Sequence, residues 1–328
     1  MINRARTNAE CRFHMVKTSL LRLVLWLFLC ATAEAAELRT ITLGLVSPNI
    51  STQLPVVVAQ QAGYFKEEGL NVHSVTIASG GTLMVAILTS GHADLVVSGV
   101  AAIMRAIDRG APVTVVSGYQ NKIDFALIGS KRVARLEDLR GKTVGVTSAG
   151  SFSEFAVLEA LKRRGFVRDK DYKLLAAGST QLRIGALKGG KVDAIPLSSG
   201  ERHTLEDEGY PVLLEVGKVV PEIPFAVAVA AKAFTAKDPD LVVRFIRALG
   251  KSMQFIKTNG DKAIQLAVAG KLRGNPDTQR RALTYFAQDL DVDIERENIA
   301  ALLSALGIKG EPEHFFDRTY LSRATAKP

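Results

Sequence analysis

Six loops rich in serine, glycine and threonine carry the side chains of this sequence whose spacing best suits chemistry. Each loop follows a strand-like apolar run and precedes a helix-like run. Hydroxyl groups and the unpaired backbone N–H groups of helix N-termini hydrogen-bond polar or anionic groups, so such loops can form a binding site. The residues expected to contact a ligand are Ser47, Asn49, Ser51, Ser79, Gly80, Gly81, Thr82, Ser98, Gly99, Ser148, Ser151, Phe152, Ser153, Ser179, Thr180, Pro196, Ser198 and Ser199.

For a single loop of this kind, an ordinary helix N-cap is the favoured interpretation, since Ser, Thr, Asn and Gly are favoured there. As a set, the six loops favour one shared cleft. In a sheet whose strands alternate with helices, the carboxyl ends of the strands face the same crevice. The loops contain neither Arg nor Lys. We therefore expect a ligand held by neutral hydrogen bonds, as oxyanions can be.

Each candidate metal site lacks either a required residue or the required spacing. The run Asp289-x-Asp291-x-Asp293 begins like a calcium loop, but Ile294 replaces the required glycine and Ala300 the closing glutamate. No histidine pairs with another histidine or a cysteine at metal-ligand spacing. The histidines considered beyond the first 36 residues are His73, His92, His203 and His314.

Each candidate catalytic motif also lacks a required residue or the required spacing. Residues 185–191 have P-loop spacing, but Val192 stands where Ser or Thr would hold magnesium. Ser148 misses the spacing of a nucleophile elbow by one residue. Both cysteines, Cys11 and Cys30, lie in the first 36 residues. The rest of the chain thus has no thiolate nucleophile, thiolate metal ligand or disulfide. We expect a protein that is not an enzyme and that needs no cofactor and no metal.

Three aromatic and two charged residues lie close to the expected cleft. Phe152 could form an apolar wall for an organic ligand, with core packing as an equal alternative. For Tyr119 and Phe225, core packing is the favoured interpretation. Glu201 is expected to complement the dipole of its helix from the first turn rather than to meet a ligand. Arg183 is expected to be a surface helix residue rather than an anion clamp.

The elements that would position these residues alternate between strand-like and helix-like runs, which is typical of parallel sheets covered by helices on both faces. One series begins at residue 40 and a second, shorter one at residue 141. Runs at 125–130 and 225–230 are predicted to pair with each other and form two neighbouring crossovers, as in a hinge. Helices after residue 234 are expected to wrap around the first lobe. We predict one lobe from residues 37–130 and 221–328, and a second from 131–220.

Residues 1–36 have the pattern of an export signal peptide. A basic start precedes an apolar run at 20–30, and small-x-small patterns place cleavage near Ala33 to Ala36. Met15 is an alternative start. A lipoprotein would need a small residue before its cysteine, but Leu29 precedes Cys30, so lipidation is the less favoured alternative.

Chain length and net charge further restrict the class of protein. The chain has 328 residues and a formal net charge of +9, and removing residues 1–36, which hold five basic and two acidic side chains, leaves +6. A chain of this length suits two lobes with their own cores. The basic residues are scattered and are not interleaved with aromatic residues, so we expect no nucleic-acid partner.

Four motifs, in order, cover essentially all of the chain after the signal. They are VVVAQQAGYFKEEGL at 56–70, ILTSGHADL at 87–95, LEDLRGKTVGV at 136–146 and ALKGGKVDA at 186–194. Together they resemble the solute-binding proteins of the nitrate, sulfonate/taurine and thiamine-pyrimidine-precursor group. Any one motif is weakly specific, whereas four in family order are strongly so.

The resemblance implies the type II periplasmic-binding-protein fold: two doubly wound α/β lobes joined by two crossover segments, with the ligand cleft between them. It implies a monomeric, periplasmic protein that captures a small polar or anionic organic solute, such as a sulfonate, nitrate or an aromatic or organic acid. The implied partner is an ABC permease in the inner membrane with its cytoplasmic ATPase.

Three alternatives stay open. The first is import of a thiamine pyrimidine precursor. The second is an enzyme on the same scaffold, although the similar pyrimidine-forming enzyme of yeasts relies on a cysteine-rich motif that this sequence lacks. The third is a free-standing ligand sensor.

Overall fold

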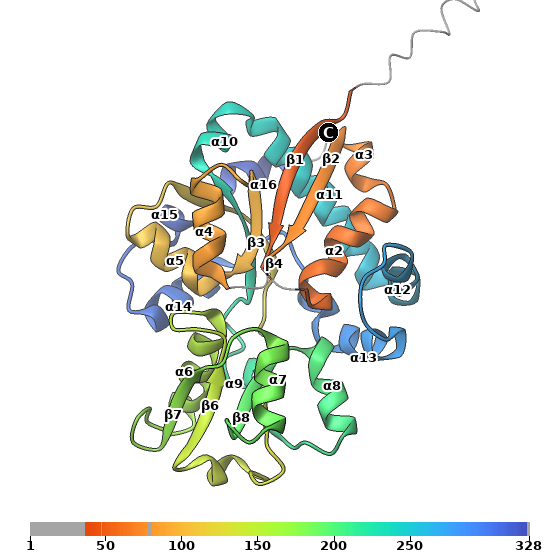
Figure 1. Cartoon of the computed structure of the whole chain (residues 1–328). Helices are drawn as coiled ribbons and strands as arrows, with labels where there is room; N and C mark the ends of the chain where they lie inside the picture. Colours follow the sequence, from red (N-terminus) through yellow and green to blue (C-terminus); the bar gives the residue numbers. More distant parts are fainter. Residues whose placement is uncertain (1–36, 47, 78–79, 327–328) are drawn as a thin grey trace, which may run out of the picture. The chain divides into compact units, whose positions relative to one another are not determined.

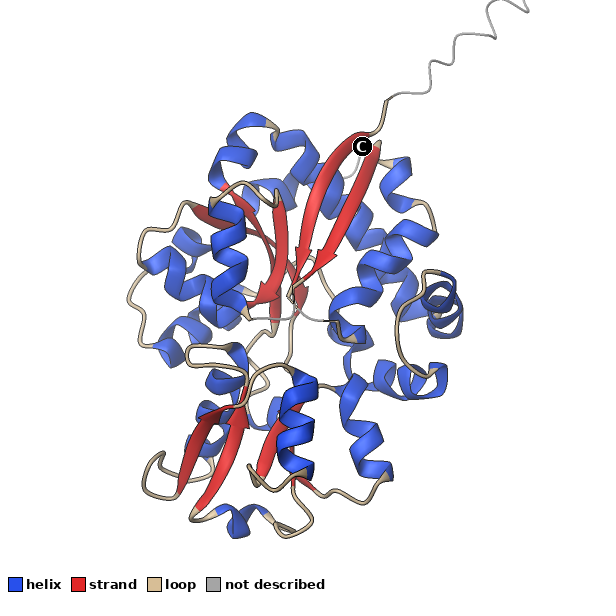
Figure 2. Ribbon diagram, viewed as in Figure 1, coloured by secondary structure: helices blue, strands red, loops and turns tan. Residues whose placement is uncertain are grey.

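The computed structural model describes residues 37–46, 48–77 and 80–326. The predicted export signal, Ser47 and Ser79 lie outside these ranges. The described chain forms two five-stranded sheets, each flanked by helices (Figures 1 and 2). None of the helices in these ranges combines the length and the apolar character that crossing a bilayer requires.

The first sheet has the strand order β2-β1-β3-β10-β4. Strand β1 runs parallel to β2 and β3, whereas β10 runs antiparallel to β3 and β4. Strands β3, β4 and most of β10 are buried, which explains their nearly continuous apolar sequence. The strands are β1 (Arg39–Leu45), β2 (Leu70–Thr76), β3 (Leu95–Gly99), β4 (Val113–Gln120) and β10 (Ala226–Ala231).

Helices from both ends of the chain cover this sheet, and together they form the first lobe. The N-terminal helices are α2 (Ile50–Gln61), α3 (Tyr64–Glu67), α4 (Gly81–Thr89) and α5 (Val100–Asp108). The C-terminal elements are α10 (Lys232–Lys237), α11 (Pro239–Thr258), α12 (Gly260–Ala269), α13 (Pro276–Phe286), η2 (Ala287–Asp289), α14 (Arg296–Leu306), α15 (Pro312–Phe315) and α16 (Arg318–Thr325).

The second sheet has the order β7-β6-β8-β5-β9 and, with its helices, forms the second lobe. Strand β6 runs parallel to β7 and β8, and β5 runs antiparallel to β8 and β9. The strands are β5 (Ala126–Gly129), β6 (Lys142–Val146), β7 (Tyr172–Ala176), β8 (Ala194–Leu197) and β9 (Val212–Glu215). The helices are η1 (Leu136–Leu139), α6 (Phe152–Arg163), α7 (Thr180–Lys188), α8 (Ser199–Asp207) and α9 (Val216–Val219).

The predicted pairing of the runs at 125–130 and 225–230 is wrong. Strand β5 lies in the second sheet, between β8 and β9, and β10 lies in the first, between β3 and β4. The chain therefore changes lobe before β5, at residues 121–125, and returns between β9 and β10. Both runs are short, apolar and buried, so their sequence carries no alternation that would assign them to one sheet rather than the other.

The C-terminal helices only partly follow the prediction that they wrap around the first lobe. Helix α11 does so, since its buried stripe of Val242, Phe245 and Leu249 is apolar at three-to-four-residue spacing and it packs on α2. Helix α13, in contrast, packs on α8 of the second lobe as well as on α12 and α2. The C-terminal segment therefore contacts both lobes.

Candidate ligand-binding cleft

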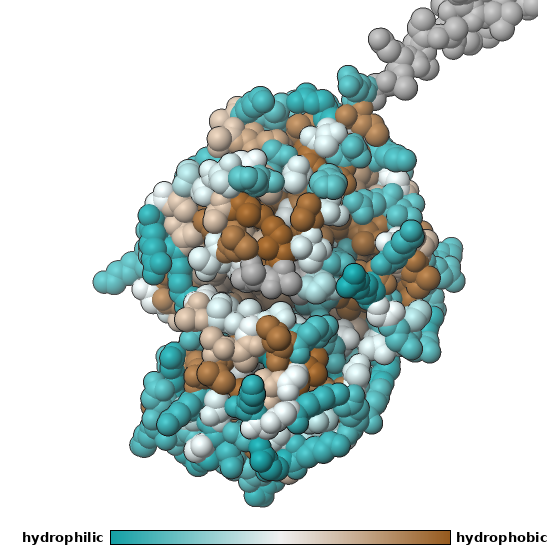
Figure 3. Space-filling view, in the orientation of Figure 1, coloured by the Kyte–Doolittle hydropathy of each residue, from teal (hydrophilic) through white to brown (hydrophobic). Residues whose placement is uncertain are grey.

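A cleft of about 520 Å³ lies between the two lobes. Its walls come from the loops after strands of both sheets, from the two crossover segments and from the start of α13. The lining residues are Val46, Pro48, Asn49, Ile50, Gly80, Gly81, Gly99, Phe125, Thr147, Ser151, Phe152, Ser153, Ser179, Thr180, Gln181, Arg183, Ser198, Gly200, Glu201, Thr204, Phe225, Arg273, Gly274, Asn275, Thr278 and Gln279. On the face shown in Figure 3, apolar side chains lie on both the upper and the lower part.

The structure brings together ten of the residues expected to contact a ligand. Those lining the cleft are Asn49, Gly80, Gly81, Gly99, Ser151, Phe152, Ser153, Ser179, Thr180 and Ser198. Six others lie in the same loops without lining it, namely Ser51, Thr82, Ser98, Ser148, Pro196 and Ser199. Ser47 and Ser79 are outside the described residues.

Several of these side chains cap the helices that point at the cleft. The Asn49 side chain accepts a hydrogen bond from the Thr52 backbone N–H at 3.0 Å, and Ser151 Oγ accepts one from the Glu154 N–H at 3.3 Å. Ser199 instead turns away: its Oγ donates to Asp124 Oδ2 at 2.7 Å. Capping holds the N-termini of α2 and α6 in place, so their backbone dipoles are directed at the cleft.

The main charged group of the cleft is Arg183. From the sequence, we expected this residue to lie on the surface of its helix. That expectation is wrong, because the residue is 6% exposed and lines the cleft. A fixed arginine thus lines the cleft, whereas the loops were expected to offer a ligand only neutral hydrogen bonds. The sequence analysis considered Arg183 and preferred the surface, because the residue lies one turn into α7 and no local pattern shows that this turn is buried.

The guanidinium of Arg183 is held entirely by neutral oxygens. Nη1 donates to Thr147 Oγ1 at 2.6 Å and to the Gly178 carbonyl at 3.0 Å. Nη2 donates to Thr180 Oγ1 at 3.3 Å and to the Pro196 carbonyl at 3.4 Å. The buried Nε–H has no partner among the described residues. Burial without a contact ion pair lowers the pKa of Arg183 to about 10.

Glu201 lies in the first turn of α8, as expected, and also lines the cleft. Its carboxyl group accepts a hydrogen bond from Ser198 Oγ. Desolvation raises the pKa of Glu201 to about 7, with the nearby Asp124 adding to the increase. The buried carboxyl of Asp124 also has a raised pKa, chiefly because of desolvation. The protonated state of Glu201 is therefore well populated near neutral pH.

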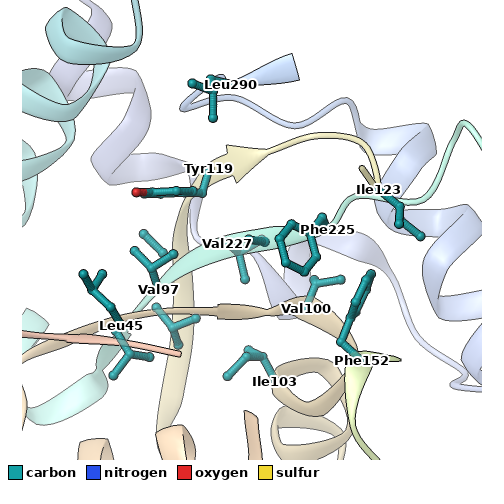
Figure 4. Packing of buried hydrophobic residues seen from close by; sticks show 14 of the residues in the cluster. Leu45, Val97, Val100, Ile103, Tyr119, Ile123, Phe152, Phe225, Val227 and Leu290 are labelled. Carbon is teal, nitrogen blue, oxygen red and sulfur yellow. The ribbon is translucent and has the colours of Figure 1, made fainter. Parts of the chain in front are cut away.

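Three phenylalanines form the apolar side of the cleft. The ring centroids of Phe125 and Phe225, from the two crossovers, are 5.2 Å apart, and Phe152 lies 5.9 Å from Phe125 and 5.0 Å from Phe225. Figure 4 shows Phe152 beside Phe225, next to Val100 of the first lobe. Phe225, for which core packing was favoured, thus also lines the cleft. Tyr119 does not: it is fully buried and its hydroxyl donates to the Thr52 carbonyl.

The segment that begins α13 supplies lining residues that the sequence analysis did not anticipate. Asn275 caps the helix, since its Oδ1 accepts from the N–H groups of Asp277 at 2.8 Å and Thr278 at 3.3 Å. The Asn-Pro pair at 275–276 is a helix-start signal that can be read from the sequence. The place of this helix start at the cleft was not anticipated, because only loops after strands were considered and this loop joins two helices.

The cleft can bind and orient a ligand, but the described residues supply little for catalysis. Among the described residues that line it there is no histidine to activate a hydroxyl group. Within the described part of the chain, no group of three or more His, Cys, Asp or Glu side chains could hold a metal ion. What the geometry provides is one buried cation, several helix N-termini and an aromatic wall.

Two α/β lobes around a cleft define the periplasmic-binding-protein fold, and a solved structure has the same architecture. The alkanesulfonate-binding protein SsuA from Xanthomonas axonopodis pv. citri, bound to MOPS, matches with a TM-score of 0.70 at 18% identity, over 84% of this chain and 96% of that one. The predicted type II periplasmic-binding-protein fold is confirmed.

The chain belongs to the NMT1/THI5-like family, whose model matches residues 51–263. It is 29% identical over 226 residues to the riboflavin-binding protein RibY of Chloroflexus aurantiacus, covering 67% of this chain and 63% of that protein. It is also 24% identical to the 4-amino-5-hydroxymethyl-2-methylpyrimidine phosphate synthase THI12 of Saccharomyces cerevisiae, over 72% of this chain and 74% of that one. The family resemblance expected from the four motifs is confirmed, and the relatives include both binding proteins and enzymes.

Proposed function

We propose that this protein is the periplasmic solute-binding component of an ABC importer, and that it captures a small organic anion by closure of its two lobes. The solute contacts both lobes only when they are closed, so its binding energy shifts the population toward the closed state. The closed complex then delivers the solute to a membrane permease.

The observation that carries the proposal is the environment of Arg183. Its hydrogen-bond partners are all neutral oxygens, although the Glu201 carboxyl is near enough to interact with it electrostatically. A buried cation of this kind is stabilised by an anion more than by a neutral ligand. Its Nε–H is buried without a partner among the described residues. The N-termini of α2, α6 and α8 add positive dipole ends around the same cleft.

The aromatic wall favours an organic body over a bare inorganic anion. Phe125, Phe152 and Phe225 line the cleft, which has room for a small organic molecule. A sulfonate or carboxylate on an apolar or aromatic body would satisfy Arg183 and bury its carbon atoms against the rings. Nitrate would leave the aromatic wall without a partner. A thiamine pyrimidine precursor stays the second candidate solute, because relatives include pyrimidine phosphate synthases.

The location and partners follow from the same proposal. The predicted export signal at residues 1–36 would take the protein to the periplasm, where a monomer would dock on an inner-membrane permease whose ATPase lies in the cytoplasm. Two sequence observations support binding rather than catalysis. After Cys30 the chain has no cysteine, and none of the lining residues forms a nucleophile–histidine pair.

A binding screen on residues 37–328 tests the proposal. After bound small molecules are removed by unfolding and refolding, the protein is titrated with benzenesulfonate, benzoate, nitrate and the thiamine pyrimidine precursor. A solute at a hundred times its dissociation constant adds about 2.7 kcal/mol of stability, which raises the Tm by several degrees. Small-angle scattering of the same samples should show a smaller radius of gyration with solute.

Mass spectrometry of the bound solute then separates binding from catalysis. The solute should be recovered unchanged after hours with the protein. Recovery of a modified product would favour the enzyme alternative. A screen in which no organic anion raises the Tm or binds in calorimetry would contradict the proposed solute class.

A further inference from the structure

Two glycines of the cleft lie where a side chain of the opposite lobe comes closest. Gly99, at the end of β3 in the first lobe, faces Phe152, the first residue of α6 in the second. Gly200, in the first turn of α8 in the second lobe, faces Ile50, the first residue of α2 in the first lobe. All four residues line the cleft, so it is bordered by two glycine contacts between the lobes.

Neither glycine is required by its own backbone. Gly99 has φ −59° and ψ 130°, which any residue adopts. Gly200 has helical backbone, where alanine is the better residue by intrinsic propensity. In Gly80, by contrast, φ is +83°, and the left-handed backbone itself favours glycine. The reason for glycine at 99 and 200 must therefore lie in what surrounds them.

The surroundings are the opposite lobe. A Cβ on Gly99 would lie 2.8 Å from Phe152 Cβ and 3.2 Å from its Cγ. A Cβ on Gly200 would lie 2.9 Å from Ile50 Cγ2. At both positions the three nearest atoms, apart from those of the adjoining chain, all belong to that one residue of the other lobe. Each lobe alone thus has room for an alanine, whereas the contact between the lobes does not.

The close approach is reinforced beside Gly200. Helix α8 packs on α13, where Arg281 Nη1 lies 2.9 Å from Asp207 Oδ2 and the Arg202 guanidinium carbon lies 4.6 Å from the centre of the Tyr285 ring. On the other side, Phe152 is 7% exposed and packs beside Phe225 (Figure 4). The two glycine contacts are thus part of a larger interface between the lobes.

We propose that Gly99 and Gly200 are closure notches: the missing Cβ atoms let Phe152 and Ile50 seat against the opposite lobe, and this determines how far the cleft closes. The inference rests on the proposed function insofar as closure serves solute capture. It goes further in assigning the closed distance to two named contacts rather than to the solute alone. Because these contacts do not involve the solute, they should favour a closed population even before a solute binds.

The variants are Gly99→Ala and Gly200→Ala, and the matched control is Gly185→Ala. Gly185 lies in α7 of the second lobe, where an added Cβ would meet nothing within 4 Å. Ile50→Ala combined with Gly200→Ala removes the Cγ2 atom that the new Cβ would meet, so it should restore closure. The single glycine variants and the control should unfold within about 2 °C of the parent, since a well-tolerated alanine changes stability little. The double variant also loses the buried Ile50 side chain, so it should unfold at a lower temperature and is judged by its label distance.

Closure is measured by the distance between spin labels on Leu83→Cys and Leu182→Cys. These side chains are exposed, one on α4 and one on α7, and residues 37–328 contain no cysteine that would compete for the label. In the parent and in the control, we expect a short-distance population that grows when benzenesulfonate is added. In Gly99→Ala and Gly200→Ala this population should shift to longer distances. The Ile50→Ala, Gly200→Ala double variant should regain it.

Affinity provides the second readout. Overpacking a contact by one methyl group should weaken benzenesulfonate binding about tenfold in each single variant, with no change in the control. Label distances in the glycine variants that equal those of the parent would overturn the proposal. So would a parent that shows no short-distance population with or without benzenesulfonate. If benzenesulfonate does not bind but the glycine variants still lose the short distance, the solute class fails while the closure notches stand.

Discussion

At the scale of single residues, the cleft combines a cation that is always charged with an acid that titrates near neutrality. Arg183 is held by neutral oxygens, and Glu201 lines the same cleft with a pKa raised to about 7. The charge that a bound anion meets therefore depends on pH through Glu201 and not through Arg183.

Replacing Arg183 by Gln should weaken binding of an organic anion about 10- to 100-fold, because a charge-assisted hydrogen bond contributes about 1.5–3 kcal/mol. Arg164→Gln is the control, since this exposed arginine lies outside the cleft and its loss changes net charge equally. Isothermal titration calorimetry measures both. Equal effects of the two substitutions would show that net charge, and not the cleft arginine, attracts the anion.

Affinity for an organic anion should fall several-fold between pH 6 and pH 8, because deprotonated Glu201 adds a negative charge to the cleft. In Glu201→Gln the affinity should be independent of pH over this range. The folded pKa lies above the unfolded value, so the acid binds more protons when folded, and stability contributed by Glu201 is lost as pH rises from about 4.5 to 7. Glu201→Gln should therefore gain stability relative to the parent as pH increases. A pH dependence that survives in this variant would point to Asp124 instead.

At the scale of elements, the cleft is lined by the N-termini of several helices. Helices α2, α6, α8 and α13 all begin at it, and three of them are capped by a side chain that accepts a backbone N–H bond. The caps therefore stabilise the helices and also hold in position the backbone N–H groups that a ligand would meet.

Asn275→Ala should lower the stability of the protein by about 1 kcal/mol, since it removes the cap of α13. Asn275→Asp keeps the acceptor and complements the helix dipole, so it should remain close to the parent. Urea denaturation followed by circular dichroism measures both. A loss in the aspartate variant as large as that in the alanine variant would mean that the amide group, and not capping, is what matters at this position.

At the scale of the whole molecule, the positive net charge favours encounters with anions. The association rate of benzenesulfonate should fall about two- to fivefold between 20 and 200 mM salt, because salt screens long-range attraction. The dissociation rate should change less, since it depends on contacts inside the closed cleft. Stopped-flow fluorescence measures both rates. An uncharged pyrimidine used as the control solute should associate at a rate independent of salt.

Much of the fold was readable from the sequence because it depends on local patterns. Alternating strand-like and helix-like runs predicted two α/β lobes, and the four motifs predicted the family. Serine- and glycine-rich loops predicted ten residues that the structure places around the cleft. These features are encoded in neighbouring residues, where propensity and capping chemistry act.

The features that only the tertiary structure decided depend on contacts between segments that are distant in the sequence. The placement of β5 and β10 in different sheets, the burial of Arg183 and the entry of α13 into the cleft all bring together residues far apart in sequence. The same holds for Gly99 and Gly200, whose backbones do not require glycine and whose neighbours belong to the opposite lobe. A sequence determines its local elements through short-range forces, whereas burial and charge environment are set by packing, which no local pattern records.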